Sequence, residues 1–240
     1  MTTLVTGASG ELGRVLVGQL GPAVRKMSRT ARDGDGWVVA DLKTGAGLAA
    51  AVDGVDTIVH CASSPSDDAE AVRNLIEAAP DVRHLIYISI VGIDEVPLPY
   101  YKAKLAAEKV IESSGVPHTI LRATQFHTLL VRIFTAAAKL PVMPVPAIPD
   151  QPIAVSEVAV ELAKLAGGEP AGRVPDLGGP ETRPLPEFAK AFLAARGKRR
   201  PILPVRVPGR TFAAFRRGEH VGPSRGSITF EEYLRNPDTA

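Results

Sequence analysis

Three glycines near the start of the chain have the spacing of a phosphate-binding turn. Residues 6–13 read TGASGELG, follow a short apolar run and open a helical pattern. Gly7 permits a tight turn, Gly10 lets backbone amides approach a pyrophosphate, and Gly13 lets the helix pack close to the strand. The helix N-terminus adds free N–H groups and the positive end of its dipole. Glycines also serve plain turns, but strand, turn and helix together favour a dinucleotide site. The residues predicted to hold the cofactor here are Gly7, Ser9, Gly10, Glu11, Leu12 and Gly13.

The second predicted strand ends at Met27-Ser28-Arg29. An acidic side chain at this point would bind the ribose 2′-hydroxyl of NAD, whereas an arginine suits the 2′-phosphate of NADP. Arg29 offers a bidentate guanidinium, with Ser28 as a hydroxyl donor and Arg32 nearby. The alternative for Arg29 is a solvated surface charge. Because no Asp or Glu stands at this point, the sequence favours NADPH or NADP over NADH.

The elements that would position these residues alternate along the first two-thirds of the chain. The short runs are apolar on both faces, which is typical of strands in a parallel sheet covered by helices. The predicted strands are residues 4–6, 24–27, 37–39, 57–59, 84–88 and 118–121. The predicted helices between them are residues 11–20, 47–52, 67–79 and 100–113. This alternation predicts an α/β fold with a doubly wound parallel sheet of the Rossmann type.

The pattern changes near Leu140. Residues 141–152 carry five prolines and are expected to form an extended loop. Helices are predicted over 156–165, with Ser156 as N-cap, and over 186–195, whose proline is tolerated in the first turn. We expect a Rossmann domain over residues 1–139, with 152–166 packed on it. Residues 140–240 would form a small α+β substrate lobe that does not fold independently.

Composition excludes several other functions. The formal net charge of +2 and the 5% aromatic content give no footprint for nucleic acid. Cys61 is the one cysteine and the five histidines show no ligand spacing, so neither a disulfide nor a metal site is expected. No apolar run approaches the roughly 20 residues that span a bilayer. With no secretory signal visible, we expect a cytoplasmic protein without a membrane partner.

Further motifs resemble one family. They are Asp41-Leu42 after the third strand, YISIVG at 87–92, YYKAK at 100–104 and TILRATQF at 119–126. With the glycine turn and the Ser28-Arg29 pair, they look like an NmrA-like atypical short-chain dehydrogenase/reductase, a NAD(P)-binding Rossmann family. The resemblance covers residues 2–180 well and the tail loosely.

The resemblance implies cofactor contacts beyond the glycine turn. Asp41 would sit against the adenine amino group, and Leu42 would pack on the adenine ring. Cys61, Ala62 and Ser63 would line the adenosine and pyrophosphate side of the cleft.

The resemblance also implies a catalytic group. Conventional members of the wider superfamily use a Tyr-x-x-x-Lys pair, in which the lysine binds ribose and the tyrosine passes a proton to a carbonyl oxygen. Tyr100 and Lys104 have this spacing, which places them on one face of a helix. Lys104 would contact the nicotinamide ribose, and Ser89 would orient the carbonyl. Eleven positions separate Ser89 from Tyr100, fewer than is usual, and the doubled Tyr100-Tyr101 leaves open which ring faces the cofactor.

A few other residues invite interpretation. Histidine as a residue type titrates near neutrality, so His127 could be catalytic, or it could make a local hydrogen bond at a helix start. Cys61 is expected to behave as a small buried apolar residue. Residues 198–217 hold seven basic side chains and no acidic one, which favours a solvated face over a nucleic-acid patch. The residues that the resemblance places at the substrate pocket are Gln125, Phe126 and His127.

Three functions remain open on the sequence. The first is an NADPH-dependent oxidoreductase that reduces a small organic acceptor, such as a quinone, an enone or a carbonyl. The second is a non-catalytic NADP(H) redox sensor that binds a protein partner. The third is an isomerase or epimerase that keeps NADP tightly bound. The substrate and the oligomeric state do not follow from the sequence.

Overall fold

The computed structural model describes residues 1–64 and 66–236 and divides into two compact units. The first unit comprises Met1–Ser89, Pro99–Arg122 and Val158–Pro175. The second comprises Ile90–Leu98, Ala123–Glu157 and the chain from Asp176 onwards. Each unit is therefore assembled from separate segments. The sequence-based prediction was a Rossmann domain over residues 1–139, with 152–166 packed on it, and a lobe over residues 140–240.

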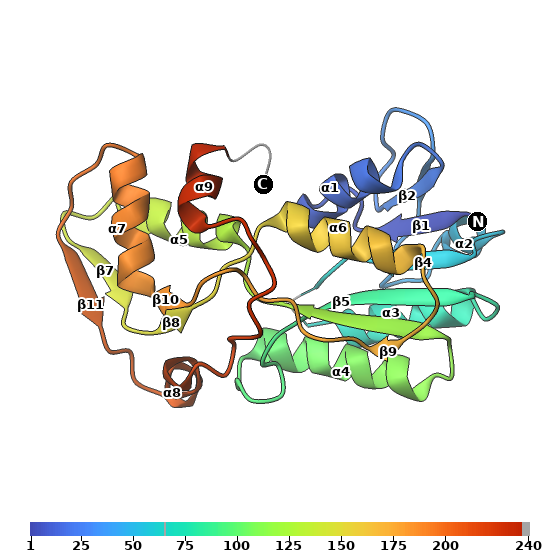
Figure 1. Ribbon diagram of the computed structural model, residues 1–240. Coiled ribbons are helices and arrows are strands. Elements are labelled where there is room, and N and C mark those ends of the chain that lie inside the picture. Colours follow the sequence, from blue (N-terminus) through green and yellow to red (C-terminus); the bar gives the residue numbers. More distant parts are fainter. Residues whose placement is uncertain (65, 237–240) are drawn as a thin grey trace. The chain divides into compact units, whose positions relative to one another are not determined.

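A parallel sheet of seven strands forms the centre of the first unit (Figure 1). The strand order is β3-β2-β1-β4-β5-β6-β9, and the described pairings are parallel. The strands are β1 Thr3–Thr6, β2 Val24–Ser28, β3 Trp37–Val39, β4 Thr57–His60, β5 His84–Ile90, β6 His118–Ala123 and β9 Gly172–Arg173. The order reverses between β1 and β4, at the switch point where open α/β sheets bind ligands. The predicted doubly wound Rossmann-type sheet is confirmed, with β9 as an addition.

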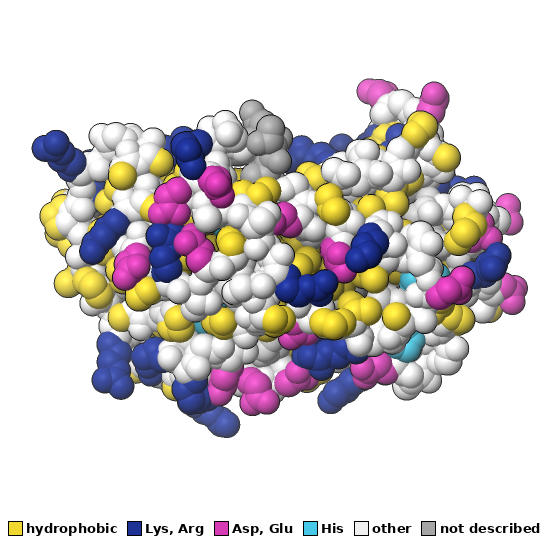
Figure 2. Space-filling view, viewed as in Figure 1, with side chains coloured by type: hydrophobic (Ala, Val, Ile, Leu, Met, Phe, Trp, Pro, Cys, Tyr) yellow, Lys and Arg dark blue, Asp and Glu magenta, His cyan; other side chains and the backbone are white. Residues whose placement is uncertain are grey.

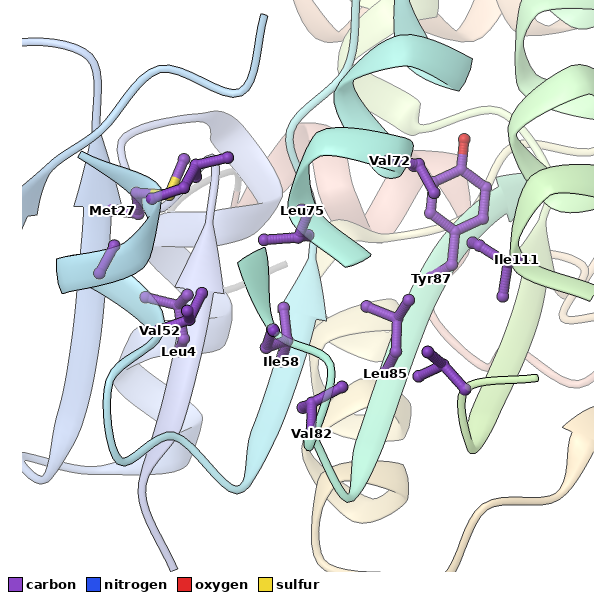
Figure 3. Close-up of a cluster of buried hydrophobic side chains, with 14 of the residues drawn as sticks. Leu4, Met27, Val52, Ile58, Val72, Leu75, Val82, Leu85, Tyr87 and Ile111 are labelled. Carbon is purple, nitrogen blue, oxygen red and sulfur yellow. The ribbon is translucent and has the colours of Figure 1, made fainter. Parts of the chain in front are cut away.

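Helices cover both faces of this sheet. The glycine turn leads into α1 (Glu11–Leu20), which shares one face with most of α6 (Val155–Ala166), while α3 (Asp68–Ala78) and α4 (Pro99–Ser113) cover the other (Figure 1). The short α2 (Leu48–Val52) contributes to the same buried cluster as α3 and α4. Figure 3 shows that cluster, in which strand residues such as Ile58 and Leu85 meet Leu75 of α3 and Ile111 of α4. Apolar burial on both faces thus fixes the strand ends that carry the site.

The turn between β1 and α1 requires glycine at the predicted positions. Gly7 has φ +64°, and a Cβ there would lie 2.6 Å from the Ala62 backbone nitrogen. A Cβ on Gly13 would lie 2.2 Å from the Gly7 carbonyl oxygen. The Gly10 amide donates to that same oxygen at 2.8 Å, so the chain turns sharply into the helix. Strand, turn and helix therefore pack backbone against backbone.

The second unit is a small α+β assembly, as predicted. Strand β7 (Met143–Pro146) pairs in parallel with β11 (Ile202–Val205), and β8 (Pro149–Asp150) pairs antiparallel with β10 (Arg183–Pro184). The unit also contains the helices α5 (His127–Ala137), α7 (Leu185–Ala195), α8 (Arg210–Arg217) and α9 (Phe230–Arg235). The core is rich in aromatic rings, including Phe134, Phe188 and Phe230. Across residues 1–64 and 66–236, no helix has the length and apolarity that a bilayer crossing requires.

Two local predictions in this region were wrong. Residues 141–152 contain β7 and β8 rather than a continuous loop, because short strands on the edge of a two-stranded sheet tolerate proline. Ser156 is not the N-cap of α6, which begins at Val155. The chain just before it is fixed by hydrogen bonds of Ile153, whose amide donates to Gln125 O at 2.8 Å and whose carbonyl accepts from His127 N at 3.0 Å. The helix α6 therefore begins directly after the segment that these hydrogen bonds hold.

Two glycines of α1 give a matched test of this packing. We expect Gly13→Ala to lower the free energy of unfolding by about 1–3 kcal/mol, because its Cβ would clash with backbone atoms that cannot move cheaply. Gly18→Ala meets no atom within 4 Å and is expected to raise stability by about 0.5–1 kcal/mol through helix propensity. Urea denaturation of both variants measures the difference. Equal effects of the two substitutions would contradict the close packing.

Candidate cofactor and active site

A cavity of about 570 Å³ lies in the first unit at the carboxyl ends of β1, β2 and β4. Its volume falls within the range of roughly 300–1,000 Å³ that is typical of cofactor and small-molecule sites. The predicted cofactor residues that line it are Gly7, Ser9, Gly10, Ser28, Arg29, Asp41, Leu42, Cys61, Ala62 and Ser63. The fold therefore brings together residues that lie far apart in the sequence.

Four predicted cofactor residues do not line the cavity: Glu11, Leu12, Gly13 and Lys104. Leu12 is buried in the packing of α1, and Gly13 provides the close approach described above. One carboxylate oxygen of Glu11 is buried without a hydrogen-bond partner in the part of the chain described. At the helix start it is the backbone amides, rather than these side chains, that are suited to a phosphate.

The end of β2 presents Arg29 to the cavity. Arg29 is exposed, and the Ser28 hydroxyl beside it donates to the Thr30 carbonyl. The Ser28 hydroxyl therefore donates its proton within its own turn and not to a cofactor phosphate. Arg32 stacks on Trp37, with 5.5 Å between the guanidinium carbon and the ring centroid, and does not line the cavity. Arg29 is thus the cation available to a phosphate at this strand end.

The loop after β3 is held by side chains of α3. Asn74 Nδ2 donates to the Leu42 carbonyl at 2.8 Å and to the Lys43 carbonyl at 3.0 Å. Asp41 Oδ1 accepts the Lys43 amide at 2.8 Å. Lys43 Nζ lies 3.0 Å from Asp67 Oδ2, and this ion pair raises the pKa of Lys43 and lowers that of Asp67. These contacts hold the loop at the wall of the cavity.

The start of the loop after β4 is fixed to β1 by Thr6. The Thr6 hydroxyl accepts the Ala62 amide at 3.3 Å and lies 2.9 Å from His60 Nδ1. Burial, with the nearby Lys104 cation, lowers the pKa of His60 to about 3, so the ring is neutral. Burial raises the pKa of Cys61 to about 12, which keeps its thiol protonated. Cys61 is only partly buried and lines the cavity, so the expectation of a buried apolar residue is met only in that the thiol stays protonated.

A chain of polar contacts joins the cavity to α4. The Tyr100 hydroxyl lies 2.8 Å from Ser63 Oγ, and Ser63 Oγ donates to Asp68 Oδ2 at 3.3 Å. Lys104 Nζ lies 3.3 Å from the same Asp68 oxygen and donates to the Ile88 carbonyl at 3.2 Å. The Asp68 and Lys104 side chains are only 1% and 3% exposed. Tyr100 and Lys104 are therefore linked through Ser63 and Asp68.

Asp68 is one of the cavity-lining residues that the sequence analysis missed. It is the first residue of α3 and lines the cavity together with Ser63 and Ser64. Its other carboxylate oxygen accepts the Ser64 amide. The sequence signal that could have revealed it is an acidic residue at the start of the helix that follows β4. Its pairing with Lys104, 36 positions later, is decided by the packing of α3 on α4.

The remaining catalytic predictions are placed as follows. Tyr101 is 2% exposed, whereas Tyr100 reaches Ser63 at the cavity, so the structure favours Tyr100 of the two rings. Ser89 is buried, and its hydroxyl has no hydrogen-bond partner within residues 1–64 and 66–236. The described hydrogen bond of the Tyr100 hydroxyl is thus to Ser63, and the role of Ser89 in orienting a carbonyl stays a prediction.

The predicted substrate residues lie in the second unit. Gln125 and Phe126 are held by the backbone bridge to Ile153. His127 is fully buried, lies 3.1 Å through Nε2 from the Ile228 carbonyl and stacks on Tyr233 with ring centroids 5.0 Å apart. Burial lowers its pKa to about 4. His127 therefore serves the core of this unit, and its predicted role at substrate gains no support from this position.

The basic stretch 198–217 covers α8 and its surroundings in the second unit. Figure 2 shows dark blue side chains in this region with magenta side chains beside them. Arg217 Nε lies 2.7 Å from Glu219 Oε1, and Arg216 Nη1 donates to the Val207 carbonyl at 2.8 Å. Arg217 is thus paired with a carboxylate, as is common for cations on a solvated surface. In the described part of the chain, no cluster of His, Cys, Asp and Glu could hold a metal ion.

Comparison with known proteins agrees with this geometry. Residues 7–128, just over half of the chain, match a family model described as NAD(P)H-binding. The chain belongs to this NAD(P)H-binding family. The glycine cradle that no Cβ fits and the cavity at the switch point are the features that a dinucleotide needs, so the residues present suit the cofactor. The resemblance to NAD(P)-binding Rossmann proteins is confirmed at this level.

One curated relative and two solved structures are informative. A (4-alkanoyl-5-oxo-2,5-dihydrofuran-3-yl)methyl phosphate reductase of Streptomyces griseus is 30% identical over 133 residues, which are 51% of this chain and 47% of that protein. The chain thus aligns with about half the length of this relative. An NADPH-dependent quinone oxidoreductase of Escherichia coli, solved with NADPH, shares the fold with TM-score 0.85 and 20% identity over 98% of this chain and 99% of that one. A nucleoside-diphosphate-sugar epimerase of Staphylococcus aureus does so with TM-score 0.82 and 19% identity over 98% and 100%.

The buried ion pair can be tested through stability. We expect Asp68→Ala to lower the free energy of unfolding by about 3–5 kcal/mol, because it leaves the buried Lys104 ammonium without its counter-charge. Adding Lys104→Met should restore much of the loss, since no unpaired charge then remains. Asp67→Ala removes the neighbouring exposed carboxylate and is the control, with little expected change. Equal losses for Asp67→Ala and Asp68→Ala would contradict the assignment.

The neutral His60 predicts a pH dependence of stability. Its folded pKa of about 3 lies below the ordinary value near 6.5, so below pH 6.5 the unfolded chain binds a proton that the folded chain refuses. Its contribution is complete above pH 6.5 and is lost as the pH falls towards 3. We expect His60→Asn to reduce the steepness of the stability decrease between pH 6 and 4 by up to about 1.4 kcal/mol per pH unit. Urea denaturation across this range measures the slope, and an unchanged slope would contradict a neutral buried ring.

Proposed function

We propose that the protein is an NADPH-dependent oxidoreductase that reduces a small organic acceptor, with Tyr100 as the proton donor. The observation that carries this proposal is the 2.8 Å contact between the Tyr100 hydroxyl and Ser63, which lines the cofactor cavity. A phenol one hydrogen bond from the cavity is within reach of an acceptor oxygen bound there. General acids in such positions commonly accelerate reactions by about 10²–10⁴-fold.

The cofactor assignment rests on the strand ends that meet at the cavity. The amides after Gly10 and the start of α1 suit the pyrophosphate, and Arg29 suits the 2′-phosphate that distinguishes NADP from NAD. Bound NADPH supplies the hydride in this chemistry. The chain itself holds the cofactor, keeps the tyrosine at the cavity and supplies the proton.

Lys104 keeps in this proposal the role at the nicotinamide ribose that the resemblance implies, and two protein contacts hold it in place. An ammonium has three donors, of which Asp68 and the Ile88 carbonyl take two. One donor is left for the nicotinamide ribose that we propose as its ligand. The cation also lies 4.6 Å from the centroid of the Tyr87 ring, a favourable distance for a cation–π contact.

The class of acceptor is suggested by the relatives. The Streptomyces griseus protein is named for a substrate with a 5-oxo-2,5-dihydrofuran ring and an alkanoyl group, and the Escherichia coli protein for quinones. Both names describe conjugated carbonyl compounds. We therefore propose a quinone, an enone or a related carbonyl compound as the acceptor.

A non-catalytic NADP(H) sensor is the second candidate. It is favoured by one observation, that the ammonium of Lys104 is already paired and that neither Lys104 nor Tyr100 lines the cavity itself. In this case the protein would bind NADPH and NADP with different affinities but would not consume NADPH with any acceptor.

Calorimetry tests the cofactor preference. We expect Arg29→Ala to weaken NADPH binding by about 1.5–3 kcal/mol, the contribution of a charged hydrogen-bonded partner, and to leave NADH binding nearly unchanged. Arg32→Ala is the matched control, because Arg32 is three residues away and stacks on Trp37 outside the cavity. Equal losses for NADPH and NADH would contradict recognition of the 2′-phosphate by Arg29.

Turnover of NADPH with menadione as acceptor tests the proton donor. Tyr100→Phe removes the phenol hydroxyl and keeps the ring, so we expect kcat to fall about 100-fold or more while the Kd for NADPH changes little. A wild-type protein that binds NADPH without consuming it in the presence of quinones and enones would favour the sensor. A Tyr100→Phe variant with unchanged kcat would remove Tyr100 from the reaction.

A further inference from the structure

The hydroxyl of Ser63 stands between two groups that compete for its proton. It donates to Asp68 Oδ2 at 3.3 Å and lies 2.8 Å from the Tyr100 hydroxyl. A serine hydroxyl has one proton and rotates freely about its C–O bond. With the proton directed at Asp68, the oxygen of Ser63 accepts the proton of Tyr100. The contact to Asp68 is the longer of the two, so little opposes a rotation of the hydroxyl towards Tyr100.

Ser63 also connects this pair to water. Its side chain is exposed and lines the cavity, whereas Tyr100 is half-buried and Asp68 and Lys104 are almost completely buried. A tyrosine that has given up its proton on each turnover must regain one before the next. The Tyr100 oxygen is joined by a described hydrogen bond to Ser63, whose side chain is in contact with solvent.

We propose that Ser63 is a catalytic residue that returns a proton from solvent to Tyr100, and that Asp68 is the residue that positions it. This inference rests on the proposed function. In each turnover the acceptor gains a hydride from NADPH and the proton of Tyr100. The Ser63 O–H bond then breaks as its proton passes to the Tyr100 oxygen, and Ser63 takes a proton from water. The sum is one NADPH and one solvent proton consumed for each reduced acceptor and NADP formed.

Asp68 gives this relay its geometry. One carboxylate oxygen binds the Ser63 hydroxyl and the Lys104 ammonium, and the other accepts the Ser64 amide, so the loop and α4 are held by one side chain. In all its described contacts here, with the Ser63 hydroxyl, the Ser64 amide and the Lys104 ammonium, the Asp68 carboxylate accepts. Asp68 therefore orients the proton of Ser63 between turnovers, and the proton itself comes from water.

The test compares the first turnover with the steady state. NADPH-loaded protein is mixed rapidly with menadione, and NADPH consumption is followed by absorbance for wild type, Ser63→Val and Ser63→Thr. Valine and threonine have the same shape and differ in the hydroxyl, so the pair isolates the proton. For Ser63→Val we expect a burst of one NADPH per protein molecule followed by a steady-state rate at least tenfold below that of wild type. Ser63→Thr should recover most of the steady-state rate relative to Ser63→Val.

Ser66→Val controls for a generic effect of valine in the same loop, because Ser66 does not line the cavity and contacts Asp67 rather than Tyr100. A steady-state rate of Ser63→Val equal to that of wild type overturns the relay and leaves the proposed function intact. Equal losses in the first turnover and the steady state also overturn the relay, since they indicate a misplaced Tyr100. No consumption of NADPH by wild type with menadione or other quinones overturns the proposed function, and the relay with it. Fluorescence titration with NADPH shows in each case whether the cofactor site is intact.

Discussion

The backbone of the β1–α1 turn and the backbone of the loop after β4 approach so closely that no Cβ fits between them. A Cβ on Gly7 would lie 2.6 Å from the Ala62 nitrogen, and the Thr6 hydroxyl holds that amide at 3.3 Å. This contact places the amides at the start of α1 and the side chain of Ser63 on one cavity. The rest of the site depends on this contact. A side chain at position 7 would push the loop after β4 away from β1, and Ser63 and Asp68 would then no longer line the cavity.

A second constraint is the pairing of two buried charges. Taking either Asp68 or Lys104 out of water alone would cost several kcal/mol, so each is stable in the interior only because the other is there. Their helices, α3 and α4, pack on the same face of the sheet over the cluster shown in Figure 3. The apolar core thus sets the distance between the helices. At this distance Asp68 can contact both Ser63 and Lys104, which lies in the first half of α4. Stability and the proposed chemistry depend on the same contact.

Polar side chains hold distant segments of the second unit together. Gln151 Nε2 donates to the Gly179 carbonyl at 2.9 Å, and its Oε1 accepts the Gly222 amide at 2.8 Å. Glu157 accepts the Ser227 hydroxyl at 2.9 Å. These hydrogen bonds join segments of the unit that lie many residues apart in the sequence. Burial raises the pKa of Asp150 beside Gln151 to about 6, because this interior disfavours the charged form of the carboxyl group.

The sequence by itself determined the sheet, most of its helices and the cofactor turn, because these follow from local patterns. Apolar runs alternate with helical periodicity, and glycine is needed at Gly7 and Gly13 wherever backbones meet so closely. The spacing of Tyr100 and Lys104 also placed both on one helix face. Only the tertiary structure decided that Asp68 pairs with Lys104, that Ser63 meets Tyr100, and that His127 is buried in an aromatic core. The physical reason is that a hydrogen bond or an ion pair between distant residues depends on how helices and loops pack in space, and no periodicity along the chain records which side chain will lie opposite.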